Sequence, residues 1–287
     1  MIEWPKQVIS DLARRRSVIF LGAGISRHSK NHDGRRPKAW VELLQSMAQG
    51  INPNRHIMSL IREKDYLTAC EVLKEAVGRD AFHEQLRDEF SNPGFQHALI
   101  HEEIFKLDSR IVATPNFDKI YETYANHAAG GSIIIKHHFD PDIAEAIRGT
   151  DRVIFKVHGT IDSPNRMIFT RKEYAEAREK YRSFYSLLEA LYLTHTFIFL
   201  GCGVNDPDIR LLLEDNFFRH PSCRPHMFVL PHGEIHNSIK GVLQESMNVR
   251  FITYKPAHDH RDLVESIGQL VTYVDNMRDE LGKTRNW

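Results

Sequence analysis

Seven short apolar runs recur along the chain, and segments with helical spacing separate them. The runs are rich in β-branched and aromatic residues, and several are apolar at consecutive positions, as in strands covered by helices on both faces. This alternation is typical of a parallel sheet built from βαβ units. We therefore predict an α/β fold with a mostly parallel sheet. The predicted strands are Ser17–Leu21, Ile111–Ala113, Ile133–Lys136, Val153–Val157, Phe197–Leu200, Met227–Leu230 and Val249–Tyr254.

The stretch between the first two predicted strands contains helical patterns and no convincing strand. We predict that residues 36–108 form an inserted helical lobe of a single domain, 1–287. Residues 109–287 would complete the core and end in an amphipathic helix that covers the sheet. The predicted helical segments are Ala39–Met47, Tyr66–Val77, Ala81–Phe90, Ala98–Leu107, Lys172–Leu193 and Arg261–Met277.

Composition excludes several classes of protein. Lysine plus arginine and aspartate plus glutamate both number 38, so no global field attracts nucleic acid or an anionic membrane. The three cysteines, Cys70, Cys202 and Cys223, are far apart and odd in number, which argues against disulfides and a cysteine zinc site. No apolar run approaches the ~20 residues that span a bilayer, and the N-terminus lacks the pattern of a secretory signal. We expect a cytoplasmic protein without direct nucleic-acid or membrane partners.

A tight glycine turn follows the first predicted strand. The segment Val18–Ser26 reads Val-Ile-Phe-Leu-Gly-Ala-Gly-Ile-Ser, and Gly22 and Gly24 permit a sharp bend and close approach of a phosphate to backbone amides. A purely structural turn is the alternative. The dehydrogenase fingerprint requires a third glycine where Arg27 stands and an acidic residue at a strand end, whereas Glu42 lies in helical surroundings. The pattern favours nucleotide binding over hydride transfer.

Polar residues follow two further predicted strands, at the end where an open α/β sheet binds its ligands. Asn116 and Asp118 stand in Ala-Thr-Pro-Asn-Phe-Asp after the second strand, although Asp118 could instead cap the next helix. His158 follows the strand Val153–Val157, and Gly159 beside it leaves room for a ligand. A histidine with an ordinary pKa near ~6.5 accepts a proton at physiological pH. The position at a strand end distinguishes His158 from the other histidines.

A second glycine turn follows the strand Phe197–Leu200. Gly201 and Gly203 precede Asn-Asp-Pro-Asp, in which Asn205 or Asp206 can cap a helix whose first turn accepts a proline. Capping explains the Asp-Pro pair. It does not explain why two glycine turns and two polar strand ends occur in one chain.

Taken in order, these four elements resemble the sirtuin-like family, in its bacterial Sir2-like branch. Gly22–Ser26 is similar to the family's Gly-Ala-Gly-x-Ser phosphate loop, and Thr114–Asp118 to its Thr-x-Asn-x-Asp motif. His158-Gly159 is similar to its catalytic His-Gly. Gly201–Ile209 resembles the glycine turn and Asp-Pro-x-Ile of the bacterial branch, and Phe169–Tyr174 the segment which that branch carries after the histidine. The resemblance covers nearly the whole chain and implies a Rossmann-like sheet.

The departures from the family decide which activity the resemblance implies. Protein deacylases of the family carry a four-cysteine zinc module, which is missing here, and Cys202-Gly203 stands where the family more often has a residue followed by serine. The resemblance therefore implies an NAD hydrolase without a metal, of the kind that depletes NAD in bacterial anti-phage defence. The alternatives are a catalytically silent module that binds NAD or ADP-ribose, and a zinc-free deacylase.

The resemblance also implies roles for individual residues and for partners. Asn116, His158 and Asp118 would be catalytic, with NAD as the substrate. Relatives of this kind are paired with a hexameric DNA-translocating ATPase of the HerA type or an Argonaute-like protein, so we expect control through a homo-oligomer or such a partner. The residues expected to bind NAD are Gly22, Ala23, Gly24, Ser26, Thr114, Asn116, Asp118, His158, Gly201, Gly203 and Asp206.

Overall fold

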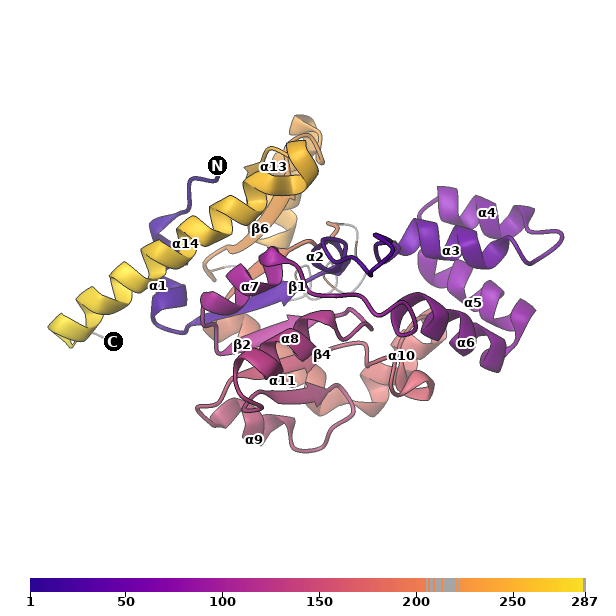
Figure 1. Cartoon of the computed structure of the whole chain (residues 1–287), viewed down its shortest axis with the longest axis horizontal. Helices are drawn as coiled ribbons and strands as arrows, with labels where there is room; N and C mark the ends of the chain where they lie inside the picture. Colours follow the sequence, from indigo (N-terminus) through magenta and orange to yellow (C-terminus); the bar gives the residue numbers. More distant parts are fainter. Residues whose placement is uncertain (205, 207–208, 210–212, 214–219, 221, 286–287) are drawn as a thin grey trace.

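The computed structural model describes residues 1–204, 206, 209, 213, 220 and 222–285 (Figure 1). Within them lies one seven-stranded sheet in the order β3-β4-β2-β1-β5-β6-β7, and every neighbouring pair is parallel. The α/β fold with a parallel sheet is therefore confirmed. Each strand contains most of the apolar run that predicted it. The strands are β1 (Ser17–Leu21), β2 (Ile111–Thr114), β3 (Ile134–His137), β4 (Val153–Lys156), β5 (Thr196–Leu200), β6 (His226–Pro231) and β7 (Val249–Tyr254).

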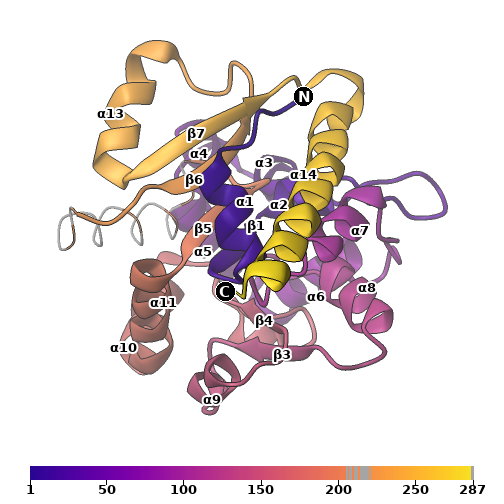
Figure 2. The same cartoon turned by 90° about the vertical axis from the view of Figure 1, so that its left-hand side faces the viewer.

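Helices connect the strands and surround the sheet (Figures 1 and 2). Those in the described part of the chain are α1 (Lys6–Ala13), α2 (Ala23–Ser26), α3 (Trp40–Ala48), α4 (Arg55–Arg62), α5 (Tyr66–Val77), α6 (Arg79–Phe90), α7 (Leu99–Lys106), α8 (Ile120–Ala128), α9 (Ile143–Arg148), the 3₁₀ turn η1 (Pro164–Arg166), α10 (Arg171–Lys180), α11 (Arg182–Thr194), α13 (Asn237–Met247) and α14 (Ala257–Thr284).

Several of these helices were not predicted, and one predicted helical segment is divided in the structure. Helices α1, α4, α9 and α13 were not among the predicted segments, and α4 follows the cis Asn52–Pro53 bond. A single helical stretch was predicted over Lys172–Leu193, whereas the structure has two helices, α10 and α11, that meet at Tyr181. Tyr181 has φ −115° and ψ 41°, which is outside the helical region, so the chain turns there. An apolar stripe with helical spacing continues across this turn and hid it.

The strand order places a change of direction at β1. The chain first adds β2, β3 and β4 on one side of β1 and then crosses to β5, β6 and β7 on the other. The loops that follow β1 and β5 are therefore neighbours at the carboxyl edge of the sheet. In open α/β sheets, such a switch point leaves a crevice in which ligands bind.

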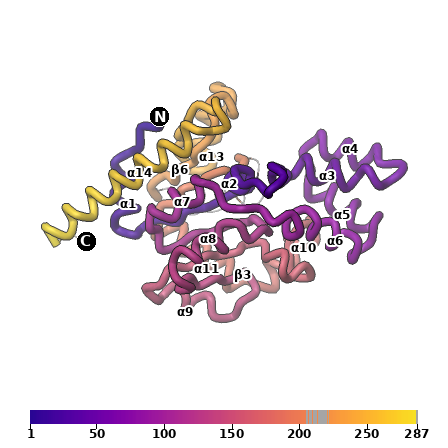
Figure 3. Tube along the Cα trace, viewed as in Figure 1, coloured from indigo at the N-terminus to yellow at the C-terminus, as the bar shows by residue number. Residues whose placement is uncertain are grey.

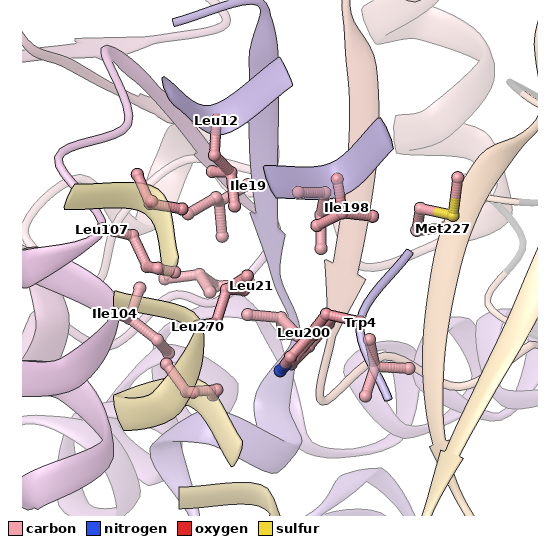
Figure 4. Close-up of a cluster of buried hydrophobic side chains, with 14 of the residues drawn as sticks. Trp4, Leu12, Ile19, Leu21, Ile104, Leu107, Ile198, Leu200, Met227 and Leu270 are labelled. Carbon is pink, nitrogen blue, oxygen red and sulfur yellow. The ribbon is translucent and has the colours of Figure 1, made fainter. Parts of the chain in front are cut away.

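Side chains from alternate positions of the strands enter two separate cores, one on each face. Ile19 and Leu21 of β1 face a cluster formed with α1, α7 and α14, which Figure 4 shows around Leu12, Leu107 and Leu270. Val18 and Phe20 point to the opposite cluster, which includes residues of α9 and α11. This alternation is the period of two expected of strands buried on both faces. The C-terminal helix α14 thus packs on one face of the sheet.

Helices α3 to α6 extend beyond the carboxyl edge of the sheet (Figures 1 and 3). They have a core of their own, in which Leu44, Cys70 and Phe82 are buried. The same cluster includes Phe117, from the loop after β2, and Phe169, from the segment after β4. These two phenylalanines join the helices to the sheet. We call α3–α6 (residues 40–90) the helical lobe.

No helix in the described part of the chain combines the length and the apolar character that crossing a bilayer requires.

Candidate active site

A cavity of about 310 Å³ lies at the carboxyl edge of the sheet, between the strand ends and the helical lobe. The loops after β1, β2, β4 and β5 all contribute to its wall. It therefore brings the four sequence elements together at the switch point. Its lining residues are Gly22, Ala23, Lys38, Trp40, Leu43, Lys64, Tyr66, Leu67, Phe90, Pro115, Asn116, Phe117, Asp118, His158, Phe169, Tyr174, Gly201, Cys202, Gly203, Val204, Asp206, Glu234 and Ile235.

The two glycine turns pack directly against each other. The amide of Gly22 donates to the carbonyl of Leu200 at 2.9 Å, and the amide of Gly24 donates to the carbonyl of Gly201 at 2.9 Å. A Cβ atom on Gly22 would lie 2.4 Å from the Gly201 oxygen. Gly201 has φ +65°, and a Cβ there would lie 2.6 Å from the amide nitrogen of Ile25. The two turns occur together because neither can hold a side chain at this contact.

Ser26 connects the first element to the second. Its hydroxyl donates to Oδ2 of Asp118 at 2.8 Å and accepts from Nδ2 of Asn116 at 3.0 Å. The other carboxylate oxygen of Asp118 accepts from the amide of Ile120 at 3.0 Å, at the start of α8. Asp118 therefore binds the start of the helix, as the capping interpretation proposed, and also fixes the serine that holds Asn116.

Three residues predicted to bind NAD lie behind the cavity wall. Ser26 and Thr114 are buried, and neither they nor Gly24 belong to the lining. Thr114 Oγ1 donates to the carbonyl of Leu21 at 2.7 Å and accepts from the amide of Asn116 at 3.1 Å. In this structure these residues shape the loops that carry Asn116 and Gly22. Their direct contact with NAD remains a prediction.

His158 follows β4, lines the cavity and is buried. Gly159 beside it has φ +89°, and a Cβ there would be 2.9 Å from the carbonyl of Arg166. Burial lowers the pKa of His158 to about 4, while the charge of Asp206 acts in the opposite direction. The imidazole is thus neutral at pH 7. The hydroxyl of Tyr174 lies 3.3 Å from Nε2 and 3.5 Å from Nδ1 of this ring.

An aromatic wall extends from His158 towards the lobe. Phe117 lies 6.2 Å from the His158 ring and stacks on Phe169 at 4.0 Å. Trp40 meets Phe169 edge to face at 5.6 Å and lies parallel to Tyr66 at 6.4 Å. The lobe aromatics were not predicted to belong to the site. The only signal was that Trp40 and Tyr66 each stand at the start of a lobe helix.

The fourth element contributes Gly203 and Asp206 to the cavity lining. Oδ1 of Asp206 accepts from the amide of Ile209 at 3.3 Å, which agrees with the capping interpretation. The predicted contributions of Asn205, Pro207 and Asp208 lie outside the described residues. Among the residues that the structure does describe, no three histidine, cysteine, aspartate or glutamate side chains form a group that would hold a metal ion.

Comparison with known proteins shows which family and which relatives the chain is similar to. Residues 110–252 match the family model described as the SIR2-like domain. The chain is 24% identical over 208 residues to the NAD(+) hydrolase ThsA of Acinetobacter baumannii, and 25% identical over 229 residues to that of Enterococcus faecium. These alignments cover 72% and 78% of this chain, but 40% and 45% of the relatives. Defense-associated sirtuin 2 of Bacillus subtilis is 25% identical over 74% of this chain and 20% of its own length. The chain therefore spans less than half the length of these relatives.

Proposed function

The chain belongs to the SIR2-like family, and on this premise we propose that it is an NAD hydrolase, which releases nicotinamide and ADP-ribose. The observation that carries the proposal is the cavity at the switch point of the sheet, where the glycine turns meet Asn116 and His158. The names of the relatives, NAD(+) hydrolase and defense-associated sirtuin, support the same activity in anti-phage defence.

The first chemical event is cleavage of the bond between C1′ of the ribose and the ring nitrogen of nicotinamide. The bonding electron pair returns to the cationic pyridinium ring, which leaves as neutral nicotinamide. Since the leaving group needs no proton, the general-acid carboxylate typical of glycosidases is not required. An active site with histidine and asparagine, without an acid carboxyl group, is sufficient for this step.

Water then attacks the oxocarbenium-like C1′ atom. The new C1′–O bond forms as the water loses a proton, which the neutral imidazole of His158 accepts. Asn116 orders the ribose and the water, while Ser26 and Asp118 hold its amide through the hydrogen bonds described above. Because bond breaking precedes the attack, a base weakened by burial is still strong enough to take this proton.

The glycine turns are suited to the pyrophosphate. Gly22 and Ala23 expose backbone at the cavity wall without a bulky side chain, and Lys38 and Lys64 of the lobe side also line the cavity. The amides of Gly22 and Gly24 already donate to carbonyls of the second turn, so the amide of Ala23 at the start of α2 is the donor that we assign to a phosphate, together with the nearby cations. We therefore place the pyrophosphate at β1 and the nicotinamide ribose near His158.

Incubation of the purified protein with NAD tests the proposal. Free nicotinamide and ADP-ribose should appear in equal amounts, without any acyl peptide. Because positioned acid–base catalysis contributes ~10²–10⁴-fold, His158→Ala and Asn116→Ala should lose activity on this scale and remain folded. Turnover of NAD by His158→Ala at the wild-type rate would contradict the assignment. Binding of NAD without products in any condition would favour the silent module.

We also propose that the activity is controlled by self-assembly or by a partner, such as a HerA-type ATPase or an Argonaute-like protein. An NAD hydrolase that was always active would harm its host. The assay should therefore be repeated over a range of protein concentrations and with the candidate partner. A specific rate that is independent of both concentration and partner would contradict this control.

A further inference from the structure

A buried ion pair lies directly beneath the proposed active site. Lys156 is the last residue of β4, two positions before His158, and Glu122 lies in the first turn of α8. Their Nζ and Oε2 atoms are 2.6 Å apart, and the two side chains are 1% and 8% exposed. Lys156 is among the largest fully buried side chains of the described residues. The reaction outlined above uses neither residue.

The ammonium group of Lys156 has a second contact. It donates to the backbone carbonyl of Asp118, in the loop that carries Asn116. The pair therefore links three segments: the strand that ends at His158, the loop that carries Asn116, and the helix that follows this loop. Two backbone hydrogen bonds also join the segment after β4 to the segment after β2. The amide of Val157 donates to the carbonyl of Thr114 at 2.9 Å, and the amide of Ile161 donates to the carbonyl of Phe117 at 3.0 Å.

The energetics of burial argue against a role in stability alone. Removing two charges from water is costly, and apolar residues of similar volume often stabilise a core as well as an ion pair does. Burial raises the pKa of Glu122, and the neighbouring Lys156 opposes this shift. What an apolar pair cannot supply is a directional donor for the Asp118 carbonyl, which fixes the position of the loop.

We propose that Lys156 and Glu122 are positioning residues, which hold the Asn116 loop in register with His158. Lys156 provides the hydrogen bond to the loop. Glu122 compensates the buried charge of Lys156 and orients the ammonium group. This proposal rests on the proposed NAD hydrolysis for its effect on the rate. Its effect on the loop does not depend on that activity.

The double variant Lys156→Met/Glu122→Leu separates positioning from stability. Either single apolar change should lower the melting temperature, since it leaves one partner buried without the other. The double variant should melt near the wild type and still lose about 10–100-fold in kcat with a smaller change in KM, as expected from displaced catalytic groups. Hydrogen exchange measured by mass spectrometry should become faster in residues 114–120.

Two further variants serve as controls. Glu122→Gln keeps a polar partner for Lys156 and the bond to Asp118, so it should retain most of the wild-type kcat and loop protection. Arg278→Met removes a partly buried cation that binds the carbonyls of Leu107 and Asp108, just before β2 and hence at the opposite end of the sheet. It should leave kcat and residues 114–120 unchanged.

The outcomes distinguish the two proposals. If the double variant protects residues 114–120 from hydrogen exchange as well as the wild type does, the positioning role is overturned. Faster exchange in these residues together with a wild-type kcat also overturns it. If the double variant fails to fold, the same comparison is made between Lys156→Met and Glu122→Gln, and equal loop protection in the two overturns it. Absence of nicotinamide release by the wild type in every condition argues against NAD hydrolysis, while the exchange measurement still decides on the ion pair.

Discussion

At the scale of single residues, the site depends on a neutral imidazole held in a dry environment. His158 is 3% exposed, and burial lowers its pKa to about 4. A base loses its function as the pH falls through its folded-state pKa, so the acid limb of the reaction should lie well below the ordinary value of ~6.5.

The first prediction follows from this shift. For the wild type, kcat/KM for nicotinamide release should stay level from pH 8 to pH 5.5 and decline only towards pH 4. Initial rates measured across this range test it, with circular dichroism at each pH to restrict the analysis to folded protein. A decline with a midpoint near pH 6.5 in folded protein would show that a base other than a buried His158 controls the rate.

The second prediction concerns Tyr174, whose hydroxyl lies 3.3 Å from Nε2 of His158. Tyr174→Phe keeps the ring that packs against the imidazole at 5.2 Å and removes only the hydroxyl. Because one hydrogen bond contributes about 0.5–1.5 kcal/mol, kcat should fall by about 2–10-fold with little change in stability. Tyr181→Phe, in the same apolar stripe but outside the cavity lining, is the matched control and should keep the wild-type kcat. Equal rates for both variants would exclude a contribution from the hydroxyl.

At the scale of elements, the strands were the most predictable part of the fold. Apolar runs reveal buried strands because both faces of each strand are covered, and parallel topology then brings the carboxyl ends to one edge. The convergence of Asn116 and His158 on one cavity follows from this rule. The lobe aromatics and the Lys156–Glu122 pair could not be assigned in the same way, because their contacts depend on how helices pack against the strand ends, which strand order does not determine.

The glycine turns show what a motif leaves undetermined. The sequence suggested that Gly22 and Gly24 make room for a phosphate, whereas the structure shows that they also make room for Gly201. Either reason is sufficient to require glycine, so the residue type alone does not separate ligand contact from packing. Only the register of β1 against β5 reveals the second reason.

The third prediction tests this packing. Gly22→Ala would place a Cβ 2.4 Å from the Gly201 oxygen, so it should destabilise the protein by about 1–3 kcal/mol and weaken NAD binding. Gly241→Ala, in α13 with no atom within 4 Å of its Cβ, should instead stabilise by about 0.5–1 kcal/mol. Urea denaturation measures both. If Gly22→Ala were as stable as Gly241→Ala, close packing of the two turns would be wrong.

At the scale of the whole molecule, buried histidines make the stability of the fold depend on pH. His101, His138, His158 and His226 are each at most 3% exposed, and burial lowers their pKa values to about 4, 3, 4 and 3. They lie in different parts of the chain, on α7, after β3, after β4 and on β6. Protonation of any one of them requires either a buried charge or local opening.

The fourth prediction is acid unfolding between about pH 6.5 and pH 4. In this window the unfolded chain binds protons at these histidines and the folded chain does not, so stability decreases as the pH falls. Each histidine contributes up to ~1.4 kcal/mol per pH unit, and four together approach the total stability of a typical domain within two units. Urea denaturation at pH 7, 6 and 5 measures the slope.

A single substitution shows whether these histidines cause the slope. His226 accepts a hydrogen bond from the amide of Phe197 at 3.0 Å through Nδ1. Asparagine can place Oδ1 as the acceptor there without a titrating group, so His226→Asn should reduce the slope below pH 6 by up to ~1.4 kcal/mol per pH unit. His32→Asn, at an exposed position, is the control and should leave the slope unchanged. A wild-type stability that is constant from pH 7 to pH 5 would mean that water reaches these imidazoles, His158 included, and the neutral base in the cavity would then titrate at its ordinary pKa.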